Sequence, residues 1–463
     1  MRLPNELIDR FLDGDASEEE RSQVLAGLES DDDNIRSFVA RSELHADLRR
    51  SLYRRSIQQT AMTAVERTPA IDHNALHRTS ALTSRLSARM TCAIVATVLA
   101  TAASLAIMFL NGPRTQPIAT LAHQSNARWA DVERIEGDAI GAGVLDLEVG
   151  IVRVDFANGA SVTLQGPTLF EVLGPGQARL HSGILTAHIP EPAVGFEVET
   201  PTLDVIDLGT AFGLSVGSDG ETDVCVFEGE VEVSIAGSQS QQTPKRVREG
   251  NAVRTRPSAG GIETVVYQTA RFEDSWPVTS GVLQTTGLMK FVSPGPEFVP
   301  GRYEDSEHIL VFPERNDVVL ETAVTVDLVE PGRYQRINRR EHHPIHAGRR
   351  VRTFLLQFDP IGRLKKEDPN KTRVMGQITF DRPIVGLIGS TESLAATDFA
   401  LGHPSGDYRH VRRGIEPPRQ KEASPPGRDL VMLSQDRHTL SLELSAGSAV
   451  DQIRVVVGQS QRN

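Results

Sequence analysis

Hydrophobic residues recur at helical spacing near the start of the chain and predict three amphipathic helices within residues 1–55. The first helix stops at Asp13-Gly14, and Ser17 with Glu20 forms a capping box that begins the second. Asp33 or Asn34 can cap the third. The apolar positions are Leu7, Ile8, Phe11 and Leu12 in the first helix, Val24, Leu25 and Leu28 in the second, and Ile35, Phe38, Val39, Leu48 and Leu52 in the third.

This helical segment is short for an independent core. About fifty residues with few large side chains form a marginally stable bundle. Two interpretations are open: the apolar positions are buried inside a small helical domain, or part of the stripe is left for a partner helix to cover. Residues 56–90 lose the helical period and are rich in Ser, Thr and Ala, which is typical of a linker.

Residues 91–112 are predicted to form a transmembrane helix. Cys92 to Leu110 contains no charged side chain, and at about 1.5 Å per residue it would span nearly the roughly 30 Å core of a bilayer. A long buried helix is the alternative. Arg85 and Arg89 before the run, and Gly112-Pro113 after it, favour the membrane interpretation. The excess of Arg on the N-terminal side predicts a cytoplasmic N-terminus and an exported C-terminal part.

Beyond the predicted membrane helix the hydrophobic period changes from helical to alternating. Residues 113–144 are expected to be a periplasmic linker and lead-in, and residues 145–255 an all-β domain. Val152, Val154 and Phe156 alternate with polar residues, and Asn158-Gly159 then predicts a hairpin turn, because both residues tolerate positive φ. Such alternation is typical of a sheet with one buried face.

Several short motifs follow one another in this stretch. They are Asn158-Gly159, Leu180-x-x-Gly183, Phe196-x-Val198-x-Thr200-Pro201, Leu208-Gly209-Thr210-x-Phe212, Val226-x-Glu228-Gly229-x-Val231-x-Val233 and Arg248-Glu249-Gly250. In this order and spacing they resemble the FecR domain. We expect structural roles for the signature residues, since glycine permits bends and close backbone approach, and Thr210 can bond the local backbone. These residues are Gly159, Gly183, Gly209, Thr210, Phe212, Glu228 and Gly229.

The resemblance implies a function. FecR-family proteins are single-pass regulators of the bacterial inner membrane, in which a cytoplasmic N-terminal segment binds an extracytoplasmic-function sigma factor and the exported domain receives the signal. Residues 1–55 would then be the anti-sigma segment. They lack the His-x-x-x-Cys-x-x-Cys motif of zinc-binding anti-sigma domains. The candidate sigma-factor contacts are Leu7, Phe11, Leu12, Leu25, Leu28 and Phe38.

Residues 269–463 depart from the family pattern. Iron-uptake members usually end in a small domain, whereas here a long segment with alternating strands follows, so an iron signal is not predicted. The strands and turns favour a β-sandwich of jelly-roll type. An envelope protein or a carbohydrate is a candidate ligand for this domain, although the fold alone does not establish one.

Composition and motifs give no support for catalysis. The net charge of −12 disfavours direct nucleic-acid binding. Cys92 and Cys225 form neither a disulfide framework nor a zinc motif. We expect the histidine-rich run Glu341–His346 to be a solvated loop, since Pro344 prevents a helical His pair. Asp204 and Asp207, three apart in a strand region, should point to opposite faces. No enzyme activity, metal or cofactor is predicted.

The sequence therefore predicts a multidomain protein: a small helical segment, one transmembrane helix, and then two mainly β domains. The favoured function is a membrane regulator that binds a sigma factor. The alternative is a membrane-anchored envelope protein whose β domains bind polysaccharide or another envelope component. The N-terminal segment distinguishes the two, because a simple anchor needs no patterned cytoplasmic domain.

Overall fold

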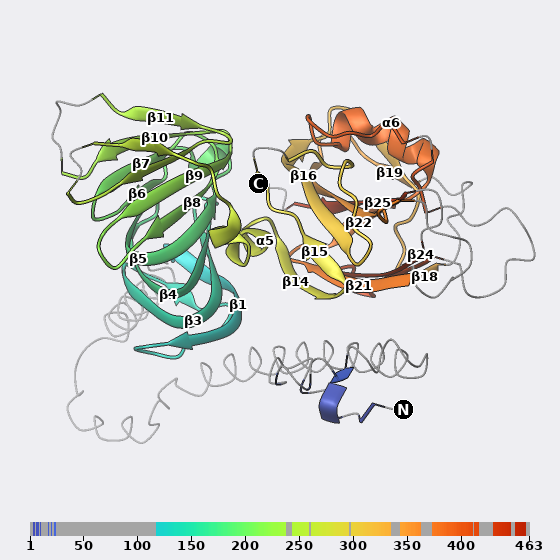
Figure 1. The fold of residues 1–463 in the computed structure, drawn as a ribbon, viewed down its shortest axis with the longest axis horizontal. Coiled ribbons are helices and arrows are strands. Elements are labelled where there is room, and N and C mark those ends of the chain that lie inside the picture. Colours follow the sequence, from blue (N-terminus) through green and yellow to red (C-terminus); the bar gives the residue numbers. More distant parts are fainter. Residues whose placement is uncertain are drawn as a thin grey trace, which may run out of the picture. The chain divides into compact units, whose positions relative to one another are not determined.

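The structure is a computed structural model, and it describes two parts of the chain (Figure 1). It covers residues 117–459 apart from 238–242, 259–260, 296–297, 335–342, 363–372, 411, 416–428 and 446–449, with a few positions between Leu3 and Val24. The chain divides into two compact units, Met1–Pro113 and Arg114–Asn463. We describe each unit by itself.

The first unit contains the predicted capping box. The backbone N–H of Ser17 donates to Glu20 Oε2 at 2.9 Å, and the backbone N–H of Glu20 donates to Ser17 Oγ at 3.3 Å. This reciprocal pair satisfies two donors that a helix start leaves open, which confirms the prediction. Leu3, Ile8 and Val24 are buried together in a small apolar cluster. The first two predicted helices therefore share an apolar contact.

The prediction of a transmembrane helix is corrected. A helix that crosses a bilayer needs about 20 residues, and α6 (Thr391–Leu401), the longest helix with bounds in the described part of the chain, has 11. Within that part, no helix is long and apolar enough to span a membrane. Residues 91–112 themselves lie outside it. The inner-membrane, single-pass localisation depended on this helix and is not supported.

The first β domain is built on one branched sheet of 13 strands (Figure 1). Its strands are β1 (Ala119–Trp129), β2 (Ala139–Ile140), β3 (Gly143–Phe156), β4 (Ser161–Gly174), β5 (Gln177–His188), β6 (Glu197–Glu199), β7 (Leu203–Asp207), β8 (Ala211–Val216), β9 (Thr222–Glu228), β10 (Glu230–Ile235), β11 (Lys245–Arg248), β12 (Ala252–Thr255) and β13 (Glu263–Val265). β1 pairs with β3 antiparallel, so the sheet begins within the stretch expected to be a lead-in.

The branch lies on β5. Residues Gln177–Arg179 of β5 pair with β6, which continues through β7 and β10 to β11. Residues Gly183–His188 pair instead with β8, which continues through β9 and β12 to β13. We call these two branches the first arm and the second arm. Val205 and Val233 of the first arm share one buried core with Leu214 and Val224 of the second, so the arms face each other.

Gly183 stands at the branch point. It has a φ of +105°, and a Cβ there would lie 2.5 Å from the carbonyl oxygen of Pro167 and 2.6 Å from Thr168 Cα. A side chain would collide with β4, so only glycine allows β5 to change partners at this position without a shift of the sheet.

The second β domain contains two five-stranded sheets (Figure 1). One has the order β14 (Val282–Gly287), β21 (Arg373–Phe380), β24 (Thr439–Ser445), β23 (Leu430–Leu433) and β18 (Gly332–Tyr334). The other has the order β15 (Met289–Phe291), β16 (Ile309–Val319), β20 (Arg350–Phe358), β25 (Asp451–Gly458) and β22 (Ile384–Ile388). A two-stranded sheet pairs β17 (Val324–Val326) with β19 (His343–Ile345).

One core joins the two sheets of this domain. Ile378 and Leu442 of the first sheet are buried in the same cluster as Phe354 and Val455 of the second. Apolar side chains from two facing sheets are the defining feature of a sandwich. The mainly β, multidomain part of the predicted fold is therefore confirmed.

A connector, residues 266–281, leads from the first β domain to the second. It contains a 3₁₀ helix, η3 (Ala270–Phe272), and the short helix α5 (Ser275–Thr279). Phe272 and Trp276 are buried against Phe227 of β9, with ring centroids 5.4 and 4.5 Å away. The connector is thus packed onto the outer side of the second arm.

A buried ion cluster joins the two domains. Arg153 of β3 contacts Asp155 at 2.8 Å and Asp381, between β21 and β22, at 2.7 Å. Arg352 of β20 lies 3.3 Å from the same Asp381. The two guanidinium groups hold the pKa of Asp381 below its usual value although burial opposes this. Charges taken out of water need such partners, so removing one of these residues would leave a buried charge without its partner.

Candidate functional site

The structure describes one of the six candidate sigma-factor contacts. Leu7 is half-buried and packs against the Leu3, Ile8 and Val24 cluster. Phe11, Leu12, Leu25, Leu28 and Phe38 lie outside the described residues. Their role in binding stays a prediction, and Leu7 contributes to the packing of its own segment.

The Asn158-Gly159 hairpin forms as predicted between β3 and β4. Gly159 has a φ of +99°, and its backbone N–H donates to the carbonyl of Phe156 at 2.8 Å. The side-chain Oδ1 of Asn158 accepts from the backbone N–H of Ala160 at 3.0 Å. The turn therefore uses asparagine as an acceptor and glycine for its left-handed backbone.

The Leu208-Gly209-Thr210 motif is held by a buried carboxylate. Asp207, with no exposed surface, accepts from the backbone N–H of Gly209 at 2.7 Å and from the hydroxyl of Thr210. Thr210 thus bonds a side chain, where we expected the local backbone. Burial raises the pKa of Asp207 to about 6, while these hydrogen bonds act to lower it. The motif is a loop closed around one carboxyl group.

Asp204 and Asp207 do not form a carboxylate pair. They lie on opposite faces of β7, as predicted, with Asp204 half-buried and Asp207 fully buried. The pKa of Asp204 is raised by partial burial and then by the nearby Glu199 and Glu197. General acid–base chemistry with two carboxylates needs both at one place, so these two residues offer none.

The signature motifs meet at one end of the arms. A Cβ added to Gly229, which has a φ of +81°, would lie 2.7 Å from the carbonyl oxygen of Gly209. The backbone N–H of Leu208 donates to Glu230 at 3.2 Å, and that of Glu249 donates to Gly229 at 2.9 Å. Segments distant in sequence are therefore bonded to one another where the chain crosses between the arms.

The remaining signature residues pack or bond nearby. Phe212 is fully buried in the core of the first β domain. Glu228 accepts a hydrogen bond from Asn316 Nδ2, on β16 of the second domain, at 2.5 Å. These positions hold the two arms and the neighbouring domain together, which supports structural roles for the motifs.

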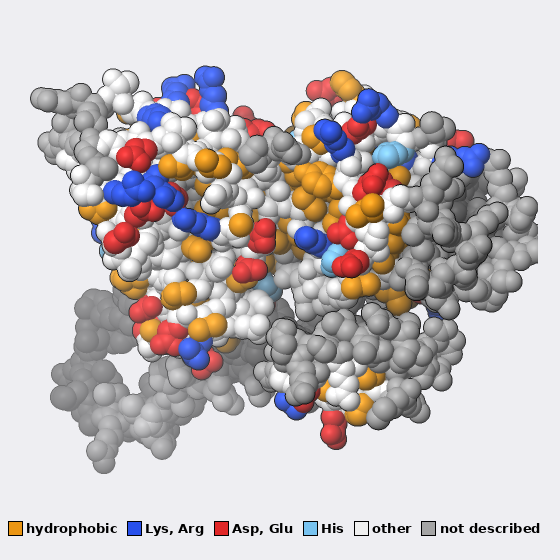
Figure 2. All heavy atoms as spheres, viewed as in Figure 1, with side chains coloured by type: hydrophobic (Ala, Val, Ile, Leu, Met, Phe, Trp, Pro, Cys, Tyr) orange, Lys and Arg blue, Asp and Glu red, His pale blue; other side chains and the backbone are white. Residues whose placement is uncertain are grey.

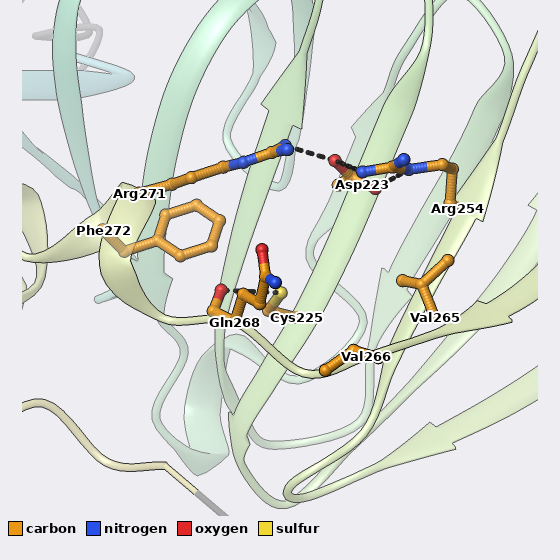
Figure 3. Close-up of a pocket in the computed structure, with 8 residues that line it drawn as sticks. All are labelled: Asp223, Cys225, Arg254, Val265, Val266, Gln268, Arg271 and Phe272. Atoms are coloured by element: carbon orange, nitrogen blue, oxygen red, sulfur yellow. Dashed lines mark hydrogen bonds and ion pairs between the residues drawn. The ribbon is translucent and has the colours of Figure 1, made fainter.

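A small hollow lies between β9, β12 and the connector (Figure 3). Its volume is about 210 Å³. Arg254 binds Asp223 through two hydrogen bonds, at 2.6 and 2.9 Å, and Arg271 of η3 bonds the same carboxylate from the other side. These ion pairs were not apparent from the sequence, because Arg271 is 48 positions from Asp223. They tie the connector to the second arm.

Cys225 forms part of the wall of this hollow (Figure 3). Burial raises the pKa of its thiol to about 11, and the Sγ atom lies 3.7 Å from the carbonyl oxygen of Gln268. The nucleophilic form of cysteine is the thiolate. A thiol that stays protonated at neutral pH is therefore a packing residue here.

The histidine-rich run is partly described. His343 belongs to β19 and pairs with Val326 of β17, whereas residues 341–342 lie outside the described part. His343 is thus in a short strand, where we expected a loop. Among the residues with assigned positions, no group of three or more His, Cys, Asp or Glu side chains could hold a metal ion.

Comparison with known proteins gives two results. Residues 148–232 match the family model of the FecR protein. Two solved structures of a candidate anti-sigma factor from Parabacteroides distasonis ATCC 8503 are also similar, at 18% and 20% identity. The alignments cover 30% and 28% of this chain, with TM-scores of 0.24 and 0.22. The chain spans 63% and 59% of the length of those two structures. No curated protein matches it.

The family match falls on the branched sheet. It begins in β3 and ends in β10, and so includes the hairpin at Gly159, the branch at Gly183 and the crossing at Gly209 and Gly229. The sequence motifs and the matched residues agree. This chain therefore carries a FecR domain.

Proposed function

We propose that this protein is a sigma-factor regulator of the FecR type. In this proposal residues 1–55 bind an extracytoplasmic-function sigma factor, and the β domains receive the signal that controls binding. The observation that carries it is the match of residues 148–232 to the FecR family model. In the matched sheet, the motifs around Gly209 and Gly229 contact each other. FecR proteins are regulators and not enzymes, and the buried thiol and separated carboxylates add no support for catalysis.

The shortage of large apolar side chains in residues 1–55 is consistent with a partner-dependent role. Among the few described residues of this segment, Leu3, Ile8 and Val24 form an apolar cluster, with Leu7 beside it. A bundle with a small core gains stability when a partner covers further apolar surface, because binding then contributes to the free energy of folding. The predicted contacts Phe11 and Leu12 lie between Ile8 and Val24 in the sequence and are the first residues to test.

The experiment expresses the full chain with an affinity tag in the cells from which the protein comes. Tagged wild-type protein should co-purify with one sigma factor, and Phe11→Ala and Leu12→Ala should weaken this capture at least tenfold while the far-ultraviolet circular dichroism stays unchanged. Glu6→Ala is the matched control, because Glu6 is exposed on the same segment. Ile8→Ala is the folding control, since Ile8 is fully buried and its truncation should reduce helicity.

The proposal is overturned by a defined result. If the wild-type chain retains no sigma factor, and deletion of residues 1–55 leaves transcription unchanged, the segment is not an anti-sigma segment. Binding of a polysaccharide or another envelope component by the β domains would then be the function to pursue.

A further inference from the structure

Two aspartates point into one end of the core between the sheets of the second β domain. The first is Asp451, where β25 begins, and its register partner on β20 is Phe358, whose side chain is buried in that core. Side chains alternate along a strand, so Asp451 belongs to the same inward-facing row as Ile453 and Val455, which are buried there too. Its carboxylate is therefore directed from one sheet toward the other.

Asp429 reaches the same end of the core from the opposite sheet. It directly precedes β23, in which Val431 and Leu433 are buried in the shared core, so alternation directs Asp429 inward as well. Its Oδ1 accepts from the backbone N–H of Ser445, the last residue of β24, at 3.0 Å. Each sheet therefore contributes one carboxylate to this end of the sandwich.

The charge of Asp451 is buried without a partner. The residue is 8% exposed, and its Oδ2 atom is buried and has no hydrogen-bond partner. Burial, and then the nearby carboxylates of Asp429 and Asp359, raise the pKa of Asp451. In the part of the chain that the structure describes, no arginine, lysine or histidine offsets these charges at Asp451. A carboxylate in such a place is costly to bury unless a positive charge joins it.

Other buried carboxylates of this domain have the partner that Asp451 lacks. Glu314 of β16 contacts Arg454 at 2.6 Å, with both side chains fully buried. Asp381 contacts Arg153 at 2.7 Å. On the surface, acidic and basic side chains are interspersed over the face of the domain that Figure 2 shows. The pair Asp429 and Asp451 is an exception, because its two charges have the same sign.

The chemistry of the two side chains selects the kind of cation. Both offer carboxylate oxygens, which Ca²⁺ and Mg²⁺ prefer, whereas Zn²⁺ sites use mainly Cys and His. Mg²⁺ usually keeps several of its waters, and the buried Oδ2 of Asp451 leaves little room for them. Among the described residues no three acidic, His or Cys side chains converge on one point. The remaining ligands would be backbone carbonyl oxygens and water, which Ca²⁺ commonly accepts.

We propose that Asp429 and Asp451 bind one calcium ion, which joins the two sheets of the second β domain at this end. Two carboxylates that repel each other without the ion are both attracted to it when it is bound. Calcium therefore stabilises this domain, and the stability of the domain follows the concentration of free calcium. This site is separate from the proposed sigma-factor contacts and does not depend on them.

The test measures the thermal stability of the full chain with and without calcium. The protein is stripped with EGTA and its melting is followed by differential scanning calorimetry, since neither tryptophan lies in the second β domain. At ten times its dissociation constant, calcium should raise the melting temperature by about 3 °C or more. The same concentration of magnesium should give a smaller shift, and isothermal titration calorimetry with calcium should show one site.

Substitutions place the ion between the two aspartates. Asp451→Asn removes one of two repelling charges, so in EGTA this variant should melt at or above the wild-type temperature, and it should lose the calcium shift. Asp429→Asn should weaken calcium binding at least tenfold, and it carries the test if Asp451→Asn melts abnormally in EGTA. Asp274→Asn is the matched control at an exposed position in the connector, and it should leave the calcium shift intact.

Three results would overturn the proposal. Calcium gives the wild-type chain no shift at neutral pH if the two carboxylates share a proton in place of a metal ion. A shift that survives in both aspartate variants places the calcium elsewhere. An equal shift with magnesium contradicts the choice of ion. None of these results bears on sigma-factor capture.

Discussion

A single added methyl group at Gly229 tests the contact between the FecR motifs. Gly229 has a φ of +81°, and its Cβ would lie 2.7 Å from the carbonyl oxygen of Gly209 and 2.8 Å from Thr210 Cγ2. A non-glycine residue in left-handed backbone costs about 1–2 kcal/mol, and the collision with backbone adds to this. We expect Gly229→Ala to lower the free energy of unfolding by about 2–4 kcal/mol.

Substitutions at other glycines of the same domain separate the cost of left-handed backbone from the cost of a steric clash at Cβ. Gly250 has a φ of +73° and open space around its Cβ position, so Gly250→Ala should cost only the strain, about 1–2 kcal/mol. Gly209 has a φ of +99° and an ordinary contact with Val194 at 3.4 Å, so it should resemble Gly250. Gly141 has ordinary backbone and open space, and Gly141→Ala should change stability by less than about 1 kcal/mol.

Tryptophan fluorescence in the full chain reports on this domain. The two tryptophans of the sequence are Trp129, on β1, and Trp276, buried in the connector. Urea titrations of the variants should therefore follow the FecR domain through Trp129, while Trp276 reports on the connector, whose apolar cluster includes Phe291 of the second β domain. If Gly229→Ala and Gly250→Ala shift the midpoint equally, the two motifs are not in contact and the reasoning is refuted.

Three further predictions concern charge and capping. Asp381→Ala leaves Arg153 buried without this partner and should destabilise the chain by about 3–5 kcal/mol, seen as a lower urea midpoint of Trp276 fluorescence; a change below about 1 kcal/mol would contradict it. Burial raises the pKa of Asp207 to about 6, above its unfolded value, so its contribution to stability is present at low pH and is lost as pH rises through about 6. Asp207→Asn should flatten this loss between about pH 4 and pH 6, the interval between the unfolded and folded pKa values, and an unchanged slope would assign it to another group. Ser17→Ala removes the capping box and should cost about 1 kcal/mol of helix stability, measured by circular dichroism; unchanged helicity would show that the cap is dispensable.

The sequence by itself determined the features that depend on neighbouring residues. Alternation at Val152, Val154 and Phe156 specified a strand with one buried face, and Asn158-Gly159 specified its turn. Ser17 and Glu20 specified a helix start, because the capping box involves only residues three apart. These interactions are encoded within a few positions, so a local pattern is enough to predict them.

The membrane prediction shows the limit of local pattern. Residues 91–112 were assigned from an uncharged run and its flanking arginines, and the helices of the described part do not support a membrane span. The contacts between the FecR motifs were also beyond what a local pattern can predict. Their glycines were assigned to bends, but the sequence did not show that Gly209 and Gly229 meet, or that Asp207 closes the loop between them.

Only the tertiary structure decided which distant residues come together. Arg153 and Asp381 are 228 positions apart, and Arg271 reaches Asp223 across 48. β5 changes its pairing partner at Gly183, from β6 to β8, and the two arms of the sheet start from this change. Pairing between strands and burial of charge depend on the whole packed chain. A strand pairs in the register that buries its apolar face, and a buried charge needs an opposite charge that another part of the fold brings next to it.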